Sequence, residues 1–336
     1  MIAMSGGVDS SVAAYLMQQQ GYECIGGTMQ LCDTPGGGRD AKAVADRLGI
    51  PLYEYDARDL FRQNVMEDFI RVYAAGGTPN PCVVCNKTMK FGYLLDRAKE
   101  LGCDYIVTGH YARIRQENGR FLLCKAPDEN KDQSYFLAGL SQQQLQHVLF
   151  PLGELTKEQV RRIAMEQGFI NAEKKDSQDI CFVPDGDYFK FITGYSGKEF
   201  PCGDFLDENG KAVGKHKNAM AYTLGQRKGL GLAMGAPVYV TGKDMAANTV
   251  TVGPEKLLFT DTLMATDLNW LAIDDLTEPM EVQAKARSRH KPQPATVYPD
   301  GRVVFHLPQR ALTPGQAVVF YNGDLVVGSG TITQVL

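Results

Sequence analysis

The sequence lacks any apolar run that approaches the ~18 residues of a membrane-spanning helix. It also lacks a basic start followed by an apolar stretch, so we expect no signal peptide and a cytoplasmic protein. Positive charge is not in excess either, because 35 Lys and Arg residues face 39 Asp and Glu residues, giving a formal net charge of −4. A nucleic acid would therefore have to be bound by local basic patches rather than by a general positive field.

Low-complexity segments and internal repeats are absent as well, and the composition is that of an ordinary globular protein, with 44% hydrophobic and 22% charged residues. A length of 336 residues exceeds what one compact core usually holds and indicates two or three domains. The eight cysteines come without an export signal, which favours a reducing compartment. There, thiols act as ligands or nucleophiles rather than as structural disulfides.

The first half of the chain alternates strand and helix patterns. Residues 25–31 and 103–111 have the character of buried strands, and helical spacing occurs between them. This order predicts an α/β domain, a doubly wound parallel sheet with helices on both faces. Ligands of such sheets bind at the carboxyl ends of the strands, where we expect residues 5–7 and 108–110 to lie together.

From Gly194 onward the pattern changes to short alternating runs separated by Asn-Gly and Pro-Asp-Gly turns, which is typical of all-β structure. We therefore expect a catalytic domain, then a small β-rich central domain, then a C-terminal β-barrel. The predicted boundaries of these three domains are 1–191, 192–254 and 255–336.

The run MSGGVDSS (4–11) lies directly before a segment with helical spacing, so it predicts a strand-to-helix turn with Asp9 or Ser10 as the N-cap. Free N–H groups at a helix start attract anions, so the turn is either a phosphate cradle or an ordinary well-capped turn. The Walker-type pattern G-x-x-x-x-G-K-[ST] is absent. GGGRDA (36–41) follows CDTP rather than a strand, so we interpret it as a loop and not as a dinucleotide site.

Three cysteines stand in distinctive surroundings, Cys82 and Cys85 in TPNPCVVCNKTMKFG and Cys181 in KKDSQDICFVPDGD. A C-x-x-C pair is compatible with half a zinc site, a redox pair or a nucleophile with a neighbour. Zinc is the weaker interpretation because no second C-x-x-C or well-spaced His pair follows. The three thiols suit either three corners of an iron–sulfur cluster or a persulfide carrier with its partner. The other cysteines are isolated: Cys24, Cys32, Cys103, Cys124 and Cys202.

The string SGGVDSS resembles the SGGxDS pyrophosphate loop of the ATP-pyrophosphatase superfamily, whose members split ATP into AMP and pyrophosphate. Further strings extend along nearly the whole chain and are similar to those of the tRNA-specific 2-thiouridylase family: TPNPCVVCNKTMKFG, DYIVTGHYARI, NKDQSYFLAGLS, KKDSQDICF, YTLGQRKGLG and TPGQAVVFYNGDLVVGSGTI. The resemblance implies an adenine-nucleotide α-hydrolase-like sheet followed by the two β domains.

The resemblance also assigns roles to positions. It implies binding of ATP, with Mg²⁺ on its phosphates, by Ala3, Met4, Ser5, Gly6, Gly7, Val8, Asp9, Ser10, Met29 and Gly109. It implies that Cys85 is catalytic and that Cys181 bears a persulfide. It implies tRNA contacts at Asn80, Pro81, Cys82, His110, Lys131, Asp132, Gln133, Arg287, Ser288 and Gln316.

The implied reaction is 2-thiolation of the wobble uridine in the tRNA anticodon stem-loop. ATP adenylates uridine O2, sulfur from the Cys181 persulfide adds to C2 and AMP leaves. Cys85 either releases hydrosulfide or closes a disulfide with Cys181, and a nearby Lys87 or Lys90 would lower a cysteine pKa. The sulfur would come from a donor protein, such as a cysteine desulfurase or a relay protein. In the alternative route, a [4Fe-4S] cluster on Cys82, Cys85 and Cys181 delivers hydrosulfide.

The chain departs from the family pattern at two places. Some members carry aspartate where this chain has Cys82, and a thiol there cannot be assumed to do the same acid–base work. Relatives have more residues before the loop and usually glycine at Ala3, so we expect a shortened first strand or an upstream start. Two basic loops, 224–231 and 285–291, are candidates for phosphate contacts with tRNA, whereas 215–217 is expected to be plain surface.

Two rival functions are distinguishable from these features. Another pyrophosphate-loop enzyme, such as an amidotransferase-type synthetase, would have no use for Cys181 in its DSQDICF surroundings. A non-catalytic metal- or cluster-containing RNA-binding protein would release no pyrophosphate from ATP and would have no need of SGGVDS.

Overall fold

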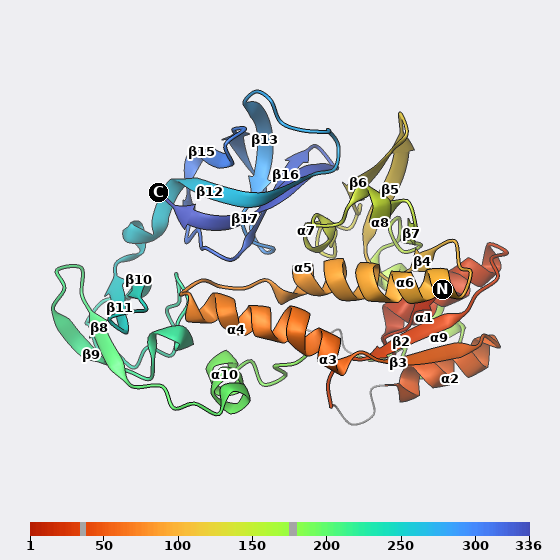
Figure 1. The fold of residues 1–336 in the computed structure, drawn as a ribbon, viewed down its shortest axis with the longest axis horizontal. Coiled ribbons are helices and arrows are strands. Elements are labelled where there is room, and N and C mark those ends of the chain that lie inside the picture. The colour runs from red at the N-terminus through yellow and green to blue at the C-terminus, as the bar shows by residue number, and fades with distance from the viewer. Residues whose placement is uncertain (34–37, 175–179) are drawn as a thin grey trace.

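The computed structural model describes residues 1–33, 38–174 and 180–336. Its first domain contains a five-stranded parallel sheet in the order β3-β2-β1-β4-β7 (Figure 1). The strands are β1 (Ile2–Ala3), β2 (Gly26–Gln30), β3 (Leu52–Asp56), β4 (Ile106–Val107) and β7 (Val148–Leu149). The strand predicted over 103–111 is much shorter than expected, because the chain leaves the sheet at Thr108 to approach the first helix.

Helices cover both faces of this sheet, as the doubly wound prediction requires. On one face α1 (Val8–Gln19) packs on α9 (Lys157–Glu166) through Val12, Ala13, Val160 and Ala164. On the other face α6 (Leu94–Glu100) buries Leu94, Leu95 and Ala98. The remaining α-helices of the described domain are α2 (Arg39–Leu48), α3 (Arg58–Phe61), α4 (Glu67–Ala74), α5 (Pro81–Cys85), α7 (Ser134–Leu137), α8 (Gln142–Leu145) and α10 (Tyr188–Ser196).

Two long helical rods run between the sheet and the rest of the molecule (Figure 1). One joins α3 to α4 through the π-helical turn η1 (Arg62–Met66), and the other joins α5 to α6 through η2 (Asn86–Tyr93). The wide η2 turns lie just after Cys85. Irregular π-type turns inside a helix are common near functional sites, because they re-aim the side chains around them.

The central β domain is a small mixed sheet in the order β10-β11-β8-β9. Its strands are β8 (Gly203–Leu206), β9 (Ala212–His216), β10 (Tyr239–Asp244) and β11 (Thr249–Gly253), with short helical turns at η3 (Ala219–Ala221) and η4 (Glu255–Leu258). A compact core around Phe205, Val240 and Val250 holds the sheet together.

The C-terminal domain is a closed antiparallel barrel of six strands, since β12 pairs with both β15 and β17. The strands are β12 (Phe259–Trp270), β13 (Met280–Lys285), β14 (Gln293–Val297), β15 (Arg302–Arg310), β16 (Ala317–Asn322) and β17 (Leu325–Val335). Closure leaves no exposed edge inside the barrel. The predicted fold class is confirmed, with its parallel sheet, small β-rich domain and barrel.

A β-hairpin of the first domain, β5 (Ala112–Glu117) and β6 (Arg120–Lys125), extends the barrel sheet through the pair Cys124 and Leu325. This hairpin was not predicted from the sequence. Asn118-Gly119 forms its turn, with φ of 50° and 78°, and this dipeptide between apolar runs is the usual sign of a hairpin. The hairpin makes the first and third domains share one sheet.

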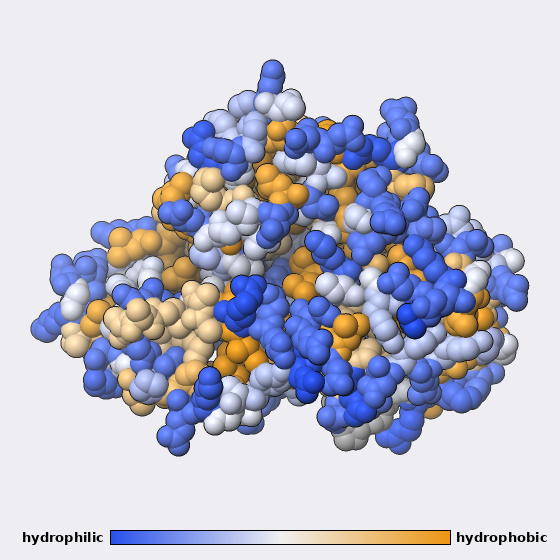
Figure 2. Space-filling view, in the orientation of Figure 1, coloured by the Kyte–Doolittle hydropathy of each residue, from blue (hydrophilic) through white to orange (hydrophobic). Residues whose placement is uncertain are grey.

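No helix in the described ranges is both long and apolar enough to span a membrane. The molecular face drawn in Figure 2 is mixed, with apolar side chains in separate groups among hydrophilic ones.

Candidate active site

The turn between β1 and α1 forms a compact loop with hydrogen bonds among its own hydroxyl groups. The Ser10 and Ser11 hydroxyls each donate to the Gly7 carbonyl at 3.0 Å, and the Ser5 N–H donates to Ser10 Oγ at 3.3 Å. The N-cap is Gly7, and no side chain caps the helix, so the prediction of Asp9 or Ser10 as N-cap was wrong. An uncapped helix start presents free N–H groups and a positive dipole end, which suits a phosphate.

Asp9 has turned inward because two partners hold its carboxylate. Lys157 Nζ contacts both oxygens at 2.7 and 2.9 Å, and the Tyr111 hydroxyl donates to one of them at 2.9 Å. Lys157 opens α9 and is largely buried, so its ammonium stays at the loop. Sequence reasoning missed Lys157, although it stands in LFPLGELTKEQVR directly after Thr156, which caps α9.

Two further polar residues, also missed from the sequence, support the loop from the same side. Asn171 Nδ2 donates to the Gly6 carbonyl at 3.1 Å and to Ser11 Oγ at 2.9 Å. Lys174 Nζ pairs with Asp40 at 2.7 Å and reaches the Gly6 carbonyl at 3.4 Å. Only their place in the fold reveals them, since nothing in the local sequence marks them as loop partners.

Gly109 brings the end of β4 against the start of α1. A Cβ on Gly109 would lie 2.6 Å from the backbone carbon of Asp9 and 2.8 Å from the nitrogen of Ser10. Gly6 has a φ of +71°, a conformation that side chains rarely adopt. Ala3 ends β1 and Met29 lies near the end of β2, so three neighbouring strands bring the predicted nucleotide residues to one edge of the sheet.

GGGRDA is only partly placed. Gly36 and Gly37 lie outside the described residues, whereas Arg39, Asp40 and Ala41 form the first turn of α2.

The thiols gather at the same edge of the sheet. Cys82 and Cys85 lie one turn apart on α5, and Cys85 packs against the aromatic core that also contacts Cys32. Burial raises the pKa of the Cys85 thiol to about 11, and the charges of Cys181, Cys82 and Cys32 add to the effect. Cys32, which the sequence analysis treated as isolated, therefore belongs to this group.

Cys181 follows residues 175–179, which lie outside the described residues and make up most of the KKDSQDICF string. The residue as a whole is exposed, yet neighbouring groups desolvate its thiol and raise its pKa. All eight cysteines are free thiols in this structure.

Lys90 places a positive charge beside the clustered thiols. Its charge lowers the pKa of both Cys85 and Cys181, although the desolvation of each thiol is larger. Lys90 Nζ lies 3.4 Å from His110 Nε2, and Thr108 Oγ1 lies 2.7 Å from His110 Nδ1. An ammonium only donates, so Nε2 accepts and His110 is neutral, in agreement with burial lowering its pKa well below the usual value.

Several predicted tRNA residues have turned into the protein. His110 is only 7% exposed, and its imidazole packs against the rings of Phe91 and Phe150. This placement does not support a direct contact with tRNA. Arg287 donates to the carbonyls of Ala311 and Leu224. Ser288 lies in the turn beside it, closed by the hydrogen bond from His290 N–H to the Arg287 carbonyl.

The predicted stretch 131–133 serves the loop before α7. Asp132 accepts hydrogen bonds from the N–H groups of Ala126 and Ser134, both at 3.1 Å. Gln133 accepts from the Tyr111 N–H at 3.0 Å, and the Lys131 N–H donates to the Asp128 carbonyl. This stretch therefore connects the loop before α7 to Tyr111, whose hydroxyl contacts Asp9.

Asn80, Pro81 and Cys82 form the start of α5, with Asn80 as N-cap and Pro81 in the first turn. The side chain of Asn80 hydrogen-bonds the Tyr135 hydroxyl. Gln316 donates to the carbonyls of Thr78 and Pro79, immediately upstream. The structure thus brings Asn80, Cys82 and Gln316 together at the edge that also holds the thiols.

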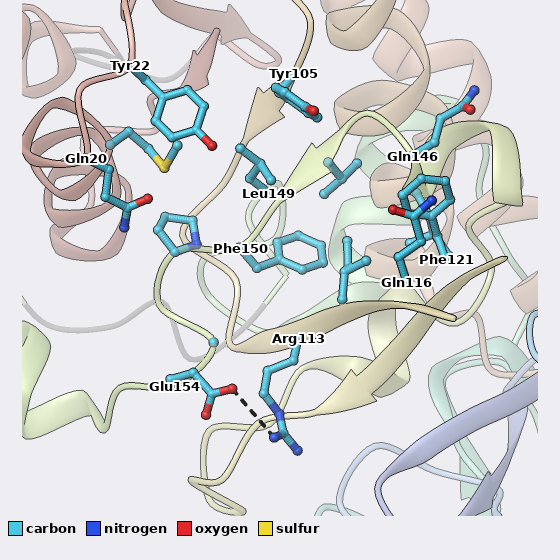
Figure 3. A pocket seen from close by; sticks show the side chains of 16 residues that line it. Gln20, Tyr22, Tyr105, Arg113, Gln116, Phe121, Gln146, Leu149, Phe150 and Glu154 are labelled. Atoms are coloured by element: carbon cyan, nitrogen blue, oxygen red, sulfur yellow. Dashed lines mark ion pairs between the residues drawn. The ribbon is translucent and has the colours of Figure 1, made fainter. Parts of the chain in front are cut away.

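A cavity lies elsewhere, beside the outermost strand β7 (Figure 3). It measures about 460 Å³ and is lined by Tyr22, Tyr105, Leu149 and Phe150, with the Arg113–Glu154 ion pair at its rim. It contains no cysteine and no part of the pyrophosphate-type loop. The carboxyl edge, where the loop and the thiols lie, is therefore the candidate active site.

A parallel sheet with an uncapped glycine-rich loop and thiols at one edge defines a nucleotide-binding α/β domain equipped for cysteine chemistry. Residues 1–185 match the family model of the tRNA methyl transferase HUP domain. Residues 189–254 match the tRNA methyl transferase PRC-barrel domain, and residues 260–332 match the aminomethyltransferase beta-barrel domain.

Curated relatives match along the full chain. The tRNA-specific 2-thiouridylase MnmA of Clostridium perfringens is 48% identical, over 100% of this chain and 98% of that protein. The proteins of the same name from Clostridium acetobutylicum and Acetivibrio thermocellus are 48% and 49% identical, over 99% of this chain and 98% of theirs. The chain belongs to the tRNA-specific 2-thiouridylase MnmA family, which confirms the predicted family.

Proposed function

We propose that this protein is an ATP-dependent tRNA-uridine 2-sulfurtransferase that thiolates the wobble uridine of the anticodon. The observation that carries the proposal is the meeting of the SGGVDSS loop with Cys85 and Cys181 at one edge of the sheet, in a member of this family. The loop would bind the ATP that activates the uridine, and the thiols would supply the sulfur.

ATP fits the loop on three grounds. The start of α1 is uncapped, Gly109 leaves no side chain over it, and the HUP-domain match supports use of ATP. The residues from Ala3 to Ser10, with Met29, would hold the nucleotide. We propose that Lys157 and Lys174, which pair with Asp9 and Asp40 beside the loop, contribute positive charge toward its phosphates. Mg²⁺ would bind the phosphate oxygens of ATP and neutralise their charge; Asp9 does not fit as its ligand in this structure, because Lys157 contacts both carboxylate oxygens.

The first step is adenylation of the base. Uridine O2 attacks the α-phosphorus of ATP, the bond to the β-phosphate breaks and pyrophosphate leaves with the electron pair. A stacked uridine cannot offer O2, so the nucleotide has to be extruded into the site. We propose that Asn80, Pro81 and Cys82, which form the start of α5, receive it.

The second step transfers sulfur. The terminal sulfur of a Cys181 persulfide adds to C2, and AMP leaves with the electrons of the C2–O2 bond. The Cys85 thiolate then attacks Cys181 Sγ, closing a Cys85–Cys181 disulfide and leaving the transferred sulfur on the base. Alternatively, Cys85 attacks first and frees hydrosulfide, which adds to C2. Either way the disulfide must be reduced by an external thiol before the next turnover.

An iron–sulfur route does not fit the described residues, because no three His, Cys, Asp or Glu side chains among them are grouped closely enough to hold a metal. Cys82 is exposed on α5, whereas Cys85 is half-buried. We derive no step through a cluster.

Contacts with tRNA are assigned to the β domains. We propose domain boundaries at 1–191, 192–254 and 255–336, with the last two gripping the anticodon stem-loop. The two basic loops, 224–231 and 285–291, are joined by the hydrogen bond from Arg287 to the Leu224 carbonyl. Such phosphate contacts would position the RNA without reading it. We further propose a cytoplasmic location and a cysteine desulfurase or relay protein as sulfur donor.

The family models carry the words methyl transferase, which suggests a second reaction to test. Methylation would need neither the pyrophosphate-type loop nor two active thiols. The discriminating experiment mixes protein, unmodified tRNA, ATP and Mg²⁺ and measures pyrophosphate. Release that depends on tRNA supports the proposal, and an Asp9→Ala variant should abolish it. A methylated base formed without ATP cleavage would overturn the proposal.

A further inference from the structure

One loop of the barrel, residues 311–316, holds the chain segment just ahead of the predicted base-binding residues. Gln316 Nε2 donates to the Thr78 carbonyl at 2.9 Å and to the Pro79 carbonyl at 3.0 Å. In return, the Thr78 N–H donates to the Pro314 carbonyl at 2.8 Å. A side-chain amide has two N–H groups, so Gln316 has no donor left to offer an RNA phosphate.

The two segments approach as closely as backbones can. A Cβ on Gly77 would lie 2.8 Å from the Pro314 carbonyl oxygen, and one on Gly315 would lie 3.0 Å from the Thr78 carbonyl oxygen. Gly315 also has a φ of +88°. There is no room for a nucleotide between these segments, so the contact is internal to the protein.

The barrel loop is itself braced from behind. Arg287 Nη2 donates to the Ala311 carbonyl at 2.7 Å and also contacts Thr313 Oγ1. The Gly315 N–H donates to the Ile332 carbonyl, and the Ile332 N–H donates to the Gln316 carbonyl, both at 2.8 Å. The loop is therefore fixed to β17 at one end and to a buried guanidinium at the other.

The 77–80 segment leads directly into α5, the helix that carries Cys82 and Cys85. The Asn80 carbonyl accepts from the Val83 N–H at 3.1 Å and starts α5, which carries Cys82 and Cys85. The side chain of Asn80 bonds the Tyr135 hydroxyl, which donates to the carbonyl of Ala317, the residue after Gln316. Both ends of the segment thus depend on the barrel.

We propose that Gln316 is a positioning residue: its two hydrogen bonds align the 77–80 segment, and through it Asn80 and the α5 thiols. Its consequence for thiolation rests on the proposed function. Because the same barrel would carry the bound tRNA, a displacement of the barrel by RNA is passed to Asn80 through two hydrogen bonds.

The test measures amide hydrogen exchange at Thr78, and alkylation of Cys82, in protein without ATP or tRNA. In Gln316→Ala we expect the Thr78 amide to exchange about tenfold faster, because loss of two hydrogen bonds lets the segment open locally. The rate of Cys82 alkylation should rise as well, because the start of α5 is released with the segment. Gln316→Glu keeps the size and the carbonyl-type oxygen but cannot donate, so it should behave like Gln316→Ala.

The matched control is Asn269→Ala. Asn269 Nδ2 also makes two hydrogen bonds across the same domain interface, to the carbonyls of Ala138 and Leu140 at 2.8 and 2.9 Å. Those acceptors are not next to Asn80, so exchange at Thr78 should stay at the wild-type rate.

With tRNA and ATP, the Gln316 variants should lose about tenfold in kcat with little change in KM for tRNA, since aligned reacting groups are lost rather than binding. Unchanged exchange at Thr78, with only a raised KM, would show a plain RNA contact and overturn the proposal. If the variants do not fold, hydrogen exchange in the wild-type protein is the test. An unprotected Thr78 amide there would contradict the contact between the 311–316 loop and the 77–80 segment. The exchange result stands apart from thiolation, so failure of the proposed function would be seen separately.

Discussion

At the scale of single residues, the proposed chemistry depends on two thiols, Cys85 and Cys181, whose surroundings oppose their ionisation. Burial raises the pKa of Cys85 to about 11 and also raises that of Cys181, whereas the charge of Lys90 lowers both. Only the thiolate is a nucleophile. The free enzyme therefore holds its thiols largely protonated, which protects them until substrate and sulfur arrive.

A pH dependence follows from this balance. Since the pKa of Cys85 lies above the working range, its thiolate fraction rises with pH throughout that range, by about tenfold per pH unit. Site-resolved alkylation followed by mass spectrometry should show the Cys85 rate climbing from pH 7 to pH 9 without a plateau. A rate that levels off below pH 8 would mean that the thiol is ionised in the free enzyme.

Lys90 should matter where Lys87 does not. Replacing Lys90 with Met removes the cation that lowers the pKa of both thiols, so alkylation of Cys85 and single-turnover thiolation should fall by about tenfold. Lys87→Met, on the same helical rod, is the control because Lys90, and not Lys87, is the lysine whose charge lowers the pKa of both thiols. Equal effects of the two changes would show a general loss of charge instead.

These residues also mark what the sequence could reveal. The family resemblance implied that Cys85 and Cys181 act in one site, and nearness in the sequence suggested Lys87 or Lys90 as the cation that acts on them. Lys157 could not be found in this way, because the pair it forms with Asp9 spans 148 positions of the chain. Cys32 was missed for the same reason, since only the end of β2 brings it to the other thiols.

At the scale of elements, the site depends on how tightly β4 and α1 meet. Gly109 is the contact point, and its missing side chain lets the strand end touch the backbone of Asp9 and Ser10. Short motifs predicted the loop well because its bonds are local. The strand predicted over 103–111 was too long, since apolar character alone does not show that the chain turns toward α1 at Thr108.

Gly109→Ala should therefore damage both stability and nucleotide binding. The new Cβ would lie 2.6 Å from the Asp9 backbone, and relieving such overpacking typically costs about 1–3 kcal/mol. We expect a lower Tm and loss of ATP-dependent stabilisation in a thermal shift assay. Gly194→Ala is the control, because it stands in α10 with nothing within 4 Å and should be neutral or stabilising. Normal ATP binding by Gly109→Ala would refute the close-contact account.

At the scale of the whole molecule, the barrel is part of the catalytic domain's core rather than an appendage. Leu123, Tyr135 and Ala138 of the first domain share one buried cluster with Tyr321 and Val326 of the barrel. The hairpin β5–β6 continues the barrel sheet (Figure 1). The sequence predicted three domains in order, but this shared core depends on contacts between distant segments that no local pattern records.

Tyr321→Ala should consequently destabilise both domains together. Its ring is fully buried in the shared cluster, and removing a buried aromatic side chain costs about 3–5 kcal/mol. Calorimetry should show the first domain and the barrel shifting to a lower Tm as one transition. Separate transitions, with only the barrel shifted, would show that the two domains fold independently.

The central claim is that sulfur passes from a Cys181 persulfide to an ATP-activated uridine. The most direct measurement loads Cys181 with one isotopically labelled persulfide sulfur and adds tRNA, ATP and Mg²⁺ without a donor. Nucleosides and cysteine peptides are then analysed by mass spectrometry. We predict one labelled 2-thiouridine per loaded enzyme, a new Cys85–Cys181 disulfide, and no thiouridine from Cys181→Ser despite continued pyrophosphate release. Labelled thiouridine formed equally well by Cys181→Ser would contradict the account.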